Sequence, residues 1–127
     1  NIARQINAAA ILPLTKSGAT AHNVSKFRPA IPILAITSES GVARRLQLVW
    51  GVMPIVITNK LNTSKTFELA MAIAQKKNIL KEGNLVVETA GTLSGVSGST
   101  DLIKVGIVNP INDEIKREMN AFNSVGS

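Results

Sequence analysis

Cysteine and tyrosine are absent from this sequence of 127 residues, and tryptophan and histidine occur once each. The lack of cysteine excludes disulfides, thiolate catalysis and cysteine-based metal sites, and it fits a reducing, cytoplasmic location. The single histidine, His22, excludes any site that needs two imidazoles. Because there are only three phenylalanines, the core has to be built from aliphatic side chains, as in the buried strands of a parallel sheet.

Long hydrophobic runs are also missing. No apolar segment approaches the ~20 residues that span a bilayer, and residues 1–6 lack the charged and apolar regions of a signal peptide. We therefore expect no membrane partner. The formal net charge of +6 attracts anions. Since the basic residues are scattered and stacking aromatics are scarce, a small anionic ligand is favoured over nucleic acid.

What is present is an alternation of short apolar blocks with helical patterns, which indicates an α/β domain. The expected strands are residues 8–14, 33–37, 54–58, 85–89 and 102–108, and the expected helices are 20–27, 38–49, 63–77 and 112 onward. About a dozen residues without a helical pattern join the last two strands, whereas a parallel crossover normally needs a helix. The sequence thus predicts a mixed sheet, with four parallel strands and an antiparallel last strand.

Local signals refine these elements. Pro13 cannot donate to a sheet ladder, so we place it near the end of the first strand. The segment 38–40 offers hydroxyls to cap a helix and an acid for its first turn. Apolar residues on several sides of the 63–77 helix predict that more than one flank is covered. Asn112 is expected to cap the last helix, and residues 123–127 are expected to be a frayed end. The apolar stripe of this last helix is Ile115, Met119 and Phe122.

The segment between the first strand and the next helix is the first candidate site, because ligands bind at this position in open α/β sheets. Its hydroxyls, lysine and glycine, with the free amides of a helix start, suit a phosphate monoester. An ordinary turn with capping hydroxyls explains the same residues equally well. The glycines of a Walker A loop or a dinucleotide fingerprint are missing. The candidate phosphate ligands are Thr15, Lys16, Ser17, Gly18 and Thr20.

A second candidate follows the fourth strand. Residues 91–100 are rich in glycine and hydroxyl side chains, and they would open at the same edge of the sheet as the first loop. The composition of this segment alone fits a wide hairpin. The convergence of two hydroxyl-rich loops instead favours a flap that closes on a ligand. The candidate residues are Gly95, Ser97, Gly98 and Ser99.

No catalytic constellation emerges from the rest of the chain. Arg44 and Arg45 fit a solvated helix face, and Trp50 fits packing in the core or at an interface. Glu88 lies in an apolar strand, but a lone carboxylate is not an acid–base pair. We therefore expect neither a catalytic residue nor a metal site in this chain.

Taken in order and spacing, these segments resemble the C-terminal domain of pyruvate kinases. The resemblance covers residues 1–108, which we take as the domain, and leaves 109–127 as an extra helix and tail. Ile2 and Ile6 are spaced as on the last turns of a truncated helix, so the domain looks cut from a longer chain. The matching segments are Thr15–Gly18, Phe27–Ile33, Ala43–Leu46, Trp50–Pro54, Phe67–Ala70, Lys81–Val87 and Gly95–Leu102.

The resemblance implies a three-layer α/β/α domain with a five-stranded mixed sheet. It also implies an allosteric site, where the Thr15–Thr20 loop holds a phosphorylated effector beneath the 91–100 flap. Family members are homotetramers, and the Arg44–Arg45 helix and the 102–108 edge strand are the contacts we expect here. Their phosphoryl transfer from phosphoenolpyruvate to ADP, with Mg²⁺ and K⁺, takes place in a barrel domain that this chain lacks, so we expect the chain alone to be inactive.

Two departures from the family pattern narrow the choice of effector. Ala19 stands where fructose-bisphosphate-regulated members commonly place an arginine, and residues 59–66 offer only Lys60 and Lys65 for a second phosphate. Three alternatives therefore stay open. They are a monophosphate effector, an assembly-only domain with a vestigial pocket, and a free-standing phosphometabolite-binding domain.

Overall fold

The computed structural model describes residues 7–15, 30–90 and 102–126 of the chain. The five predicted strands all form, with the third beginning earlier than expected, whereas the helix expected at 20–27 lies outside the described residues. In chain order the elements are β1 (Ala10–Leu14), β2 (Ile33–Thr37), α3 (Ser40–Leu46), β3 (Val52–Val56), α4 (Thr63–Lys76), β4 (Leu85–Ala90), β5 (Leu102–Ile107) and α5 (Asp113–Gly126).

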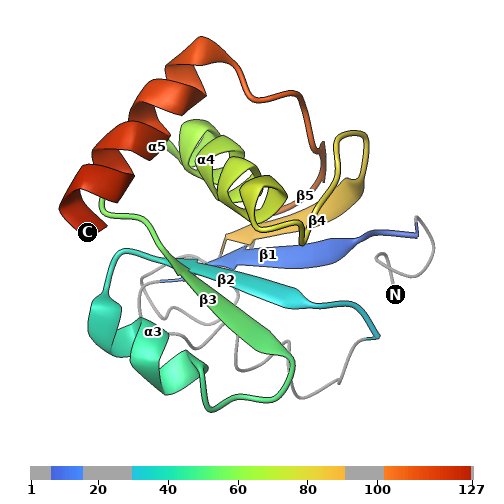
Figure 1. Cartoon of the computed structure of the whole chain (residues 1–127). Coiled ribbons are helices and arrows are strands. Elements are labelled where there is room, and N and C mark those ends of the chain that lie inside the picture. The colour runs from blue at the N-terminus through green and yellow to red at the C-terminus, as the bar shows by residue number, and fades with distance from the viewer. Residues whose placement is uncertain (1–6, 16–29, 91–101, 127) are drawn as a thin grey trace.

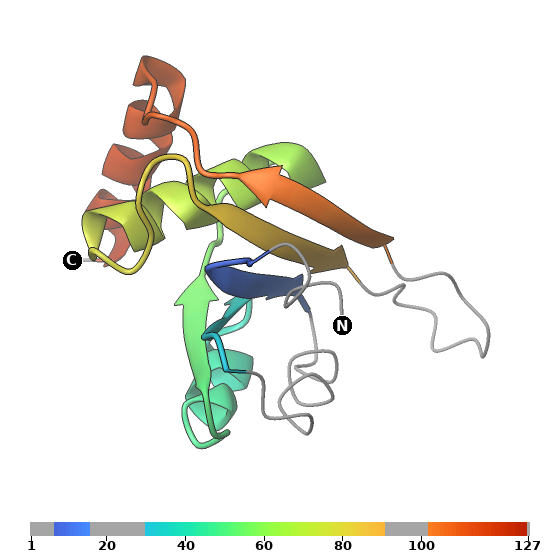
Figure 2. The same ribbon diagram turned by 90° about the vertical axis from the view of Figure 1, so that its right-hand side faces the viewer.

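The five strands form one sheet in the order β3-β2-β1-β4-β5. The first three of these contacts are parallel and β5 runs antiparallel to β4, which confirms the predicted mixed sheet. Helices α4 and α5 lie on one face of the sheet and α3 lies on the other (Figure 1), so the domain has three layers. Figure 2 shows β5 at the outer edge of the sheet.

The core is aliphatic and lies mainly between the sheet and α4. Alternate residues of each strand point to opposite faces, so Leu34 and Ile36 of β2 join the cluster under α4, whereas Ala35 packs with α3. Helix α4 is buried on more than one flank, as predicted, because Leu69 and Ile73 are buried together with the expected stripe. The buried cluster on this face is Ala10, Leu12, Leu34, Ile36, Ile55, Ile57, Phe67, Leu69, Ala70, Met71, Ala72, Ile73, Ala74, Leu80, Val86, Val108 and Ile115.

Pro13 lies near the end of its strand, as expected, but that strand is the central one. Along β1 the backbone amides of Ile11 and Thr15 donate to β2, at 3.0 Å to the carbonyl of Pro32 and 2.9 Å to that of Ile36. Pro13 occupies the intervening position, where the chain has no N–H to donate. The ladder with β2 accordingly has fewer paired positions than the ladder with β4, which runs without a break from Ala10 to Leu14.

Two predicted helix ends are wrong in detail. Helix α3 has Glu39 as its N-cap, with no side-chain capping bond and no acid in its first turn. The hydroxyl oxygen of Thr37 instead accepts a hydrogen bond from the Glu39 amide at 3.1 Å. At the end of the chain α5 continues to Gly126, so a frayed end from residue 123 is not observed. The predicted cap of this helix is confirmed, because the Asn112 side chain accepts from the Ile115 amide at 2.8 Å.

Trp50 is not a core residue. It is 60% exposed in the connection between α3 and β3, beside the almost fully exposed Leu48. Both lie where β2 and β3 begin, at the opposite edge of the sheet from the carboxyl ends of the strands. Packing of Trp50 inside the domain is therefore excluded. Arg44 and Arg45 are exposed on α3, as the sequence predicts.

Candidate functional site

A pocket of about 330 Å³ opens at the carboxyl ends of the parallel strands, next to the start of α4. The chain leaves β1 for β2 and β3 on one side, and then returns to β4 on the other side of β1. This reversal is the topological switch point, where open α/β sheets bind their ligands. The described residues that line the pocket are Leu14, Thr15, Ile36, Thr37, Ser38, Ile57, Asn59, Leu61, Thr63, Thr66 and Ala90.

The polar side chains of the described lining are neutral. Thr15 and Thr37 are buried at the ends of β1 and β2, and they line the pocket together with apolar strand residues. The hydroxyl of Thr66 donates to the Asn62 carbonyl oxygen at 2.9 Å. No lysine or arginine occurs among the described lining residues. The described lining therefore offers hydrogen bonds, and the charge to balance an anion has to come from residues other than these.

Of the predicted phosphate ligands, the described residues include only Thr15, which is buried and lines the pocket. The remaining predicted ligands, which are Lys16, Ser17, Gly18, Thr20, Gly95, Ser97, Gly98 and Ser99, lie outside the described residues. The strands that lead to them are neighbours, since Leu14 pairs with Ala90 at the carboxyl edge of the sheet. The two segments thus begin side by side, next to the pocket.

Sequence reasoning missed the other polar residues of the pocket. These follow the second and third strands or begin the long helix, and they are Thr37, Ser38, Asn59, Thr63 and Thr66. A signal was present, because polar residues come directly after both apolar strands. The carboxyl ends of parallel strands meet at one edge of a sheet, so these residues were candidates in the same way as Thr15.

Asn59 and the first turn of α4 are held by α5. The Asn59 side-chain amide donates to the carboxylate of Glu118 at 2.9 Å and to its backbone carbonyl at 3.2 Å. The ammonium group of Lys65 lies 3.1 Å from the Glu114 carboxylate and 3.6 Å from that of Glu68. The hydrogen bond to Glu114 raises the pKa of Lys65. Hydrogen bonds and an ion pair therefore connect the α4 side of the pocket to α5.

Glu88 is a buried carboxylate on β4, outside the pocket lining. It lies opposite Lys104 of β5, and its carboxylate occupies the space above Gly106 where any other residue would place a Cβ atom. Burial raises the pKa of Glu88, and the repulsion of Glu68 adds to this effect while the attraction of Lys104 opposes it. Among the described residues the charged groups that act on Glu88 are Lys104 and Glu68, and its carboxylate packs against β5 at Gly106.

Replacing Glu88 by glutamine is expected to raise the melting temperature at neutral pH and to have no such effect in acid. Because the folded-state pKa is raised, the folded protein holds this proton more tightly than the unfolded chain, and ionisation costs stability. That cost is absent below the ordinary pKa of 4.5 and grows as the pH rises toward the folded-state value. Thermal melts from about pH 4 to pH 8 measure the difference.

The control for this prediction is Glu82→Gln, which removes an exposed carboxylate from the turn after α4. Its melting temperature should follow that of the native chain over the whole pH range. A gain from Glu88→Gln that is equal at every pH would contradict the assigned cause.

Metal binding and membrane insertion find no support in the described part of the chain. Within residues 7–15, 30–90 and 102–126 no three His, Cys, Asp or Glu side chains gather as metal ligands. Among the same residues no helix has the length and apolar character needed to cross a bilayer.

Comparison with known proteins matches nearly the whole chain to one family. The sequence model described as "Pyruvate kinase, alpha/beta domain" matches residues 1–106. The chain is 57% identical to pyruvate kinase 2 of Synechocystis over 110 residues, which are 87% of this chain and 19% of that protein. It is 40% identical to pyruvate kinase of Geobacillus stearothermophilus over 109 residues, which are 86% of this chain and 19% of that protein.

The fold agrees with the same family. A structure of Cryptosporidium parvum pyruvate kinase in complex with ADP superposes with a TM-score of 0.75 at 29% identity, over 84% of this chain and 21% of that one. The chain thus spans about a fifth of the length of these relatives. The chain belongs to the pyruvate kinase family and corresponds to the C-terminal alpha/beta domain of its members.

Proposed function

We propose that this chain is the regulatory domain of a pyruvate kinase and binds a phosphorylated effector at the switch point between β1 and β4. The observation that carries the proposal is the pairing of Leu14 with Ala90 beside the pocket. Because of this pairing, the Thr15–Thr20 loop and the 91–100 segment leave the sheet side by side. The two segments that the sequence favours for phosphate binding therefore start at one edge.

The chemistry of the pocket is compatible with a phosphate monoester. Its hydroxyl-rich lining supplies neutral donors, and Lys16, the first residue beyond the described end of β1, supplies a positive charge. In this proposal Ser17 and Thr20 donate further hydrogen bonds, and Gly18 allows the backbone to approach the phosphate. Gly95, Ser97, Gly98 and Ser99 belong to the flap that covers the ligand.

The activity of the whole protein is assigned to parts that this chain does not contain. We propose phosphoryl transfer from phosphoenolpyruvate to ADP, with Mg²⁺ and K⁺, in a cytoplasmic enzyme. Residues 1–108 would be the regulatory unit, and 109–127 an addition to it. The chain alone would be inactive, with the effector and the other domains and subunits of a homotetramer as its partners.

Assembly is the second part of the proposal, and the β5 edge supports it. The strand has no partner on its outer side among the described residues, and an unpaired edge readily adds another strand. One face of β4 and β5 also carries exposed apolar side chains at adjacent positions, which are Leu85, Ile103, Val105 and Ile107. We propose that a second copy of this chain covers them. No lysine or arginine occurs among the described residues of the pocket lining, which favours an assembly-only domain as the alternative.

A thermal-shift screen of the 127-residue chain with inorganic phosphate, sugar phosphates and nucleotides tests effector binding. A ligand that binds only the folded state raises the melting temperature by mass action. Lys16→Ala is expected to weaken phosphate binding about tenfold or more, because a charge-assisted hydrogen bond is lost. Dissociation constants from calorimetry measure the change.

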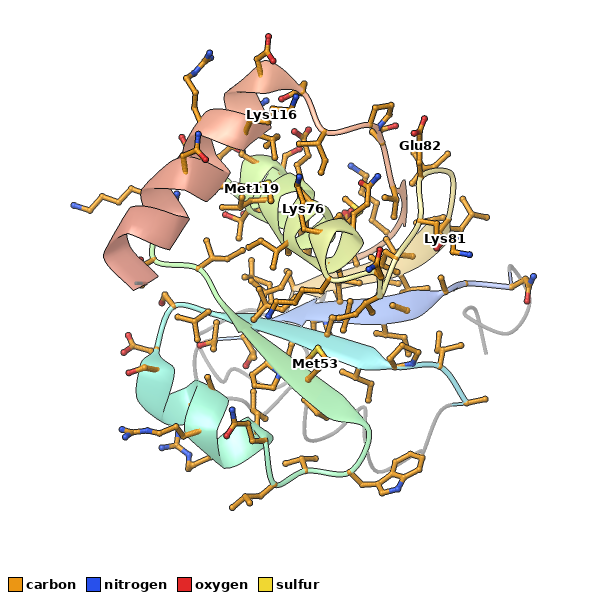
Figure 3. All side chains as sticks on the ribbon, viewed as in Figure 1. Met53, Lys76, Lys81, Glu82, Lys116 and Met119 are labelled. Carbon is orange, nitrogen blue, oxygen red and sulfur yellow. The ribbon has the colours of Figure 1, made fainter. Side chains whose placement is uncertain are left out.

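Lys76→Ala is the matched control, since Lys76 is exposed in the last turn of α4, away from the pocket (Figure 3). It should bind phosphate as the native chain does. If no phosphorylated compound shifts the melting temperature at millimolar concentration, effector binding is rejected and the assembly-only function remains. Retained affinity in Lys16→Ala would move the site elsewhere.

A further inference from the structure

Helix α5 holds the polar groups on the α4 side of the pocket. Glu118 accepts two hydrogen bonds from the amide of Asn59, a residue that lines the pocket. One turn earlier on α5, Glu114 pairs with Lys65 in the first turn of α4. The two acids are four positions apart and therefore share one face of α5. This face lies against the connection from β3 to α4 (Figure 1).

These contacts change what the pocket presents to an anion. The amide nitrogen of Asn59 is the donor of that side chain, and it already donates to Glu118 at 2.9 and 3.2 Å. The remaining oxygen is an acceptor, which does not favour a phosphate. The Glu118 carboxylate adds a negative charge directly behind a lining residue, and Glu114 engages the ammonium group of Lys65. Each of these effects makes it less favourable for a bound ligand to carry a second negative charge into the pocket.

The docking of α5 does not depend on these acids. Ile115 is buried in the main core cluster, and Met119 and Ile111 pack against the same cluster. Figure 3 shows Met119 between α5 and α4. Apolar burial thus supplies the stabilisation that seats α5. Helix α5 lies beyond residues 1–106, which the family model matches.

We propose that α5 is a built-in restraint on the pocket, in which Glu118, supported by Glu114, weakens the binding of anions and favours ligands of low charge. The proposal rests on the proposed function, namely that the pocket binds a phosphate group. It gives the departures at residues 59–66 a physical consequence, because Asn59 and Lys65 of this segment are engaged by α5. Movement of α5 away from Asn59 would then raise the affinity of the pocket for more highly charged ligands.

The test compares the binding of inorganic phosphate and pyrophosphate by the native chain, Glu118→Ala and Glu118→Gln. The alanine variant removes the charge and the side-chain acceptor, and leaves the Asn59 amide only its hydrogen bond to the backbone carbonyl of position 118. Glutamine removes the charge and keeps a side-chain acceptor. We expect Glu118→Ala to bind phosphate about 5- to 10-fold more tightly, with a larger gain for pyrophosphate and an intermediate gain for Glu118→Gln. Calorimetry gives the dissociation constants, and thermal melts report whether each variant is folded.

Glu82→Ala is the control, because it removes one carboxylate from the turn at the far end of α4 (Figure 3). It should bind both probes as the native chain does. Equal affinities in all four proteins, or weaker binding by Glu118→Ala, would overturn the restraint and leave the proposed function intact. Absence of binding in every protein, Glu118→Ala included, would overturn the proposed effector binding together with the restraint.

Discussion

Leu12→Ala is expected to lower the free energy of unfolding by about 3–5 kcal/mol. Leu12 is fully buried in β1, the central strand, and belongs to the cluster between the sheet and α4. Truncation removes buried apolar surface and leaves a cavity that a central strand, paired on both sides, closes poorly. Since natural domains are stable by only about 5–15 kcal/mol, the variant should lose a large part of its stability.

Chemical denaturation with urea measures this loss, and Leu48→Ala is the matched control. The same atoms are removed there from a side chain that is 89% exposed. The control should change the free energy of unfolding by no more than about 0.5 kcal/mol. Similar losses in the two variants would show that the burial of Leu12 is not what stabilises the central strand.

The second large effect concerns assembly through β5. We expect the chain to self-associate and Val105→Lys to raise the dissociation constant about 100-fold. Val105 lies at the middle of the exposed apolar face that Ile103 and Ile107 also form. A lysine at this position would have to be buried in the contact without a partner, and charged residues on edge strands oppose pairing in natural sheets.

Sedimentation velocity over a series of concentrations measures the association. Leu48→Lys is the control, because it places the same charge on an exposed apolar position before β3, the strand at the opposite edge of the sheet from β5. That variant should associate as the native chain does. A native chain that stays monomeric at the highest concentration would reject β5 as a contact between isolated domains.

The strands and the cap of the last helix were the parts of this fold that the sequence predicted best. Asn112 was expected to cap the last helix, and its side chain accepts from the Ile115 amide. The antiparallel orientation of β5 followed from a connection too short for a helical crossover. The start of α3 was predicted less well, because three adjacent polar residues are candidates for the cap there. Glu39 takes the N-cap position without a side-chain capping bond, and Thr37 accepts from the amide of Glu39.

The candidate site was predicted only in part. Thr15 lies where the sequence places it, and the segments at 16–20 and 91–100 stay predictions. Trp50 could not be placed from sequence, because an aromatic residue between apolar neighbours fits a core and an interface equally well. Its 60% exposure follows from its position in the connection before β3.

The sequence by itself determined the class of the domain and the order of its described elements. These features depend on side-chain periodicity, caps and turns, which involve residues a few positions apart. Only the tertiary structure decided which polar groups meet at the pocket. Asn59 and Glu118 are 59 positions apart, and their contact requires α5 to dock on α4 beside the β3–α4 connection. Such contacts depend on strand order and helix packing, on which local sequence patterns carry no information.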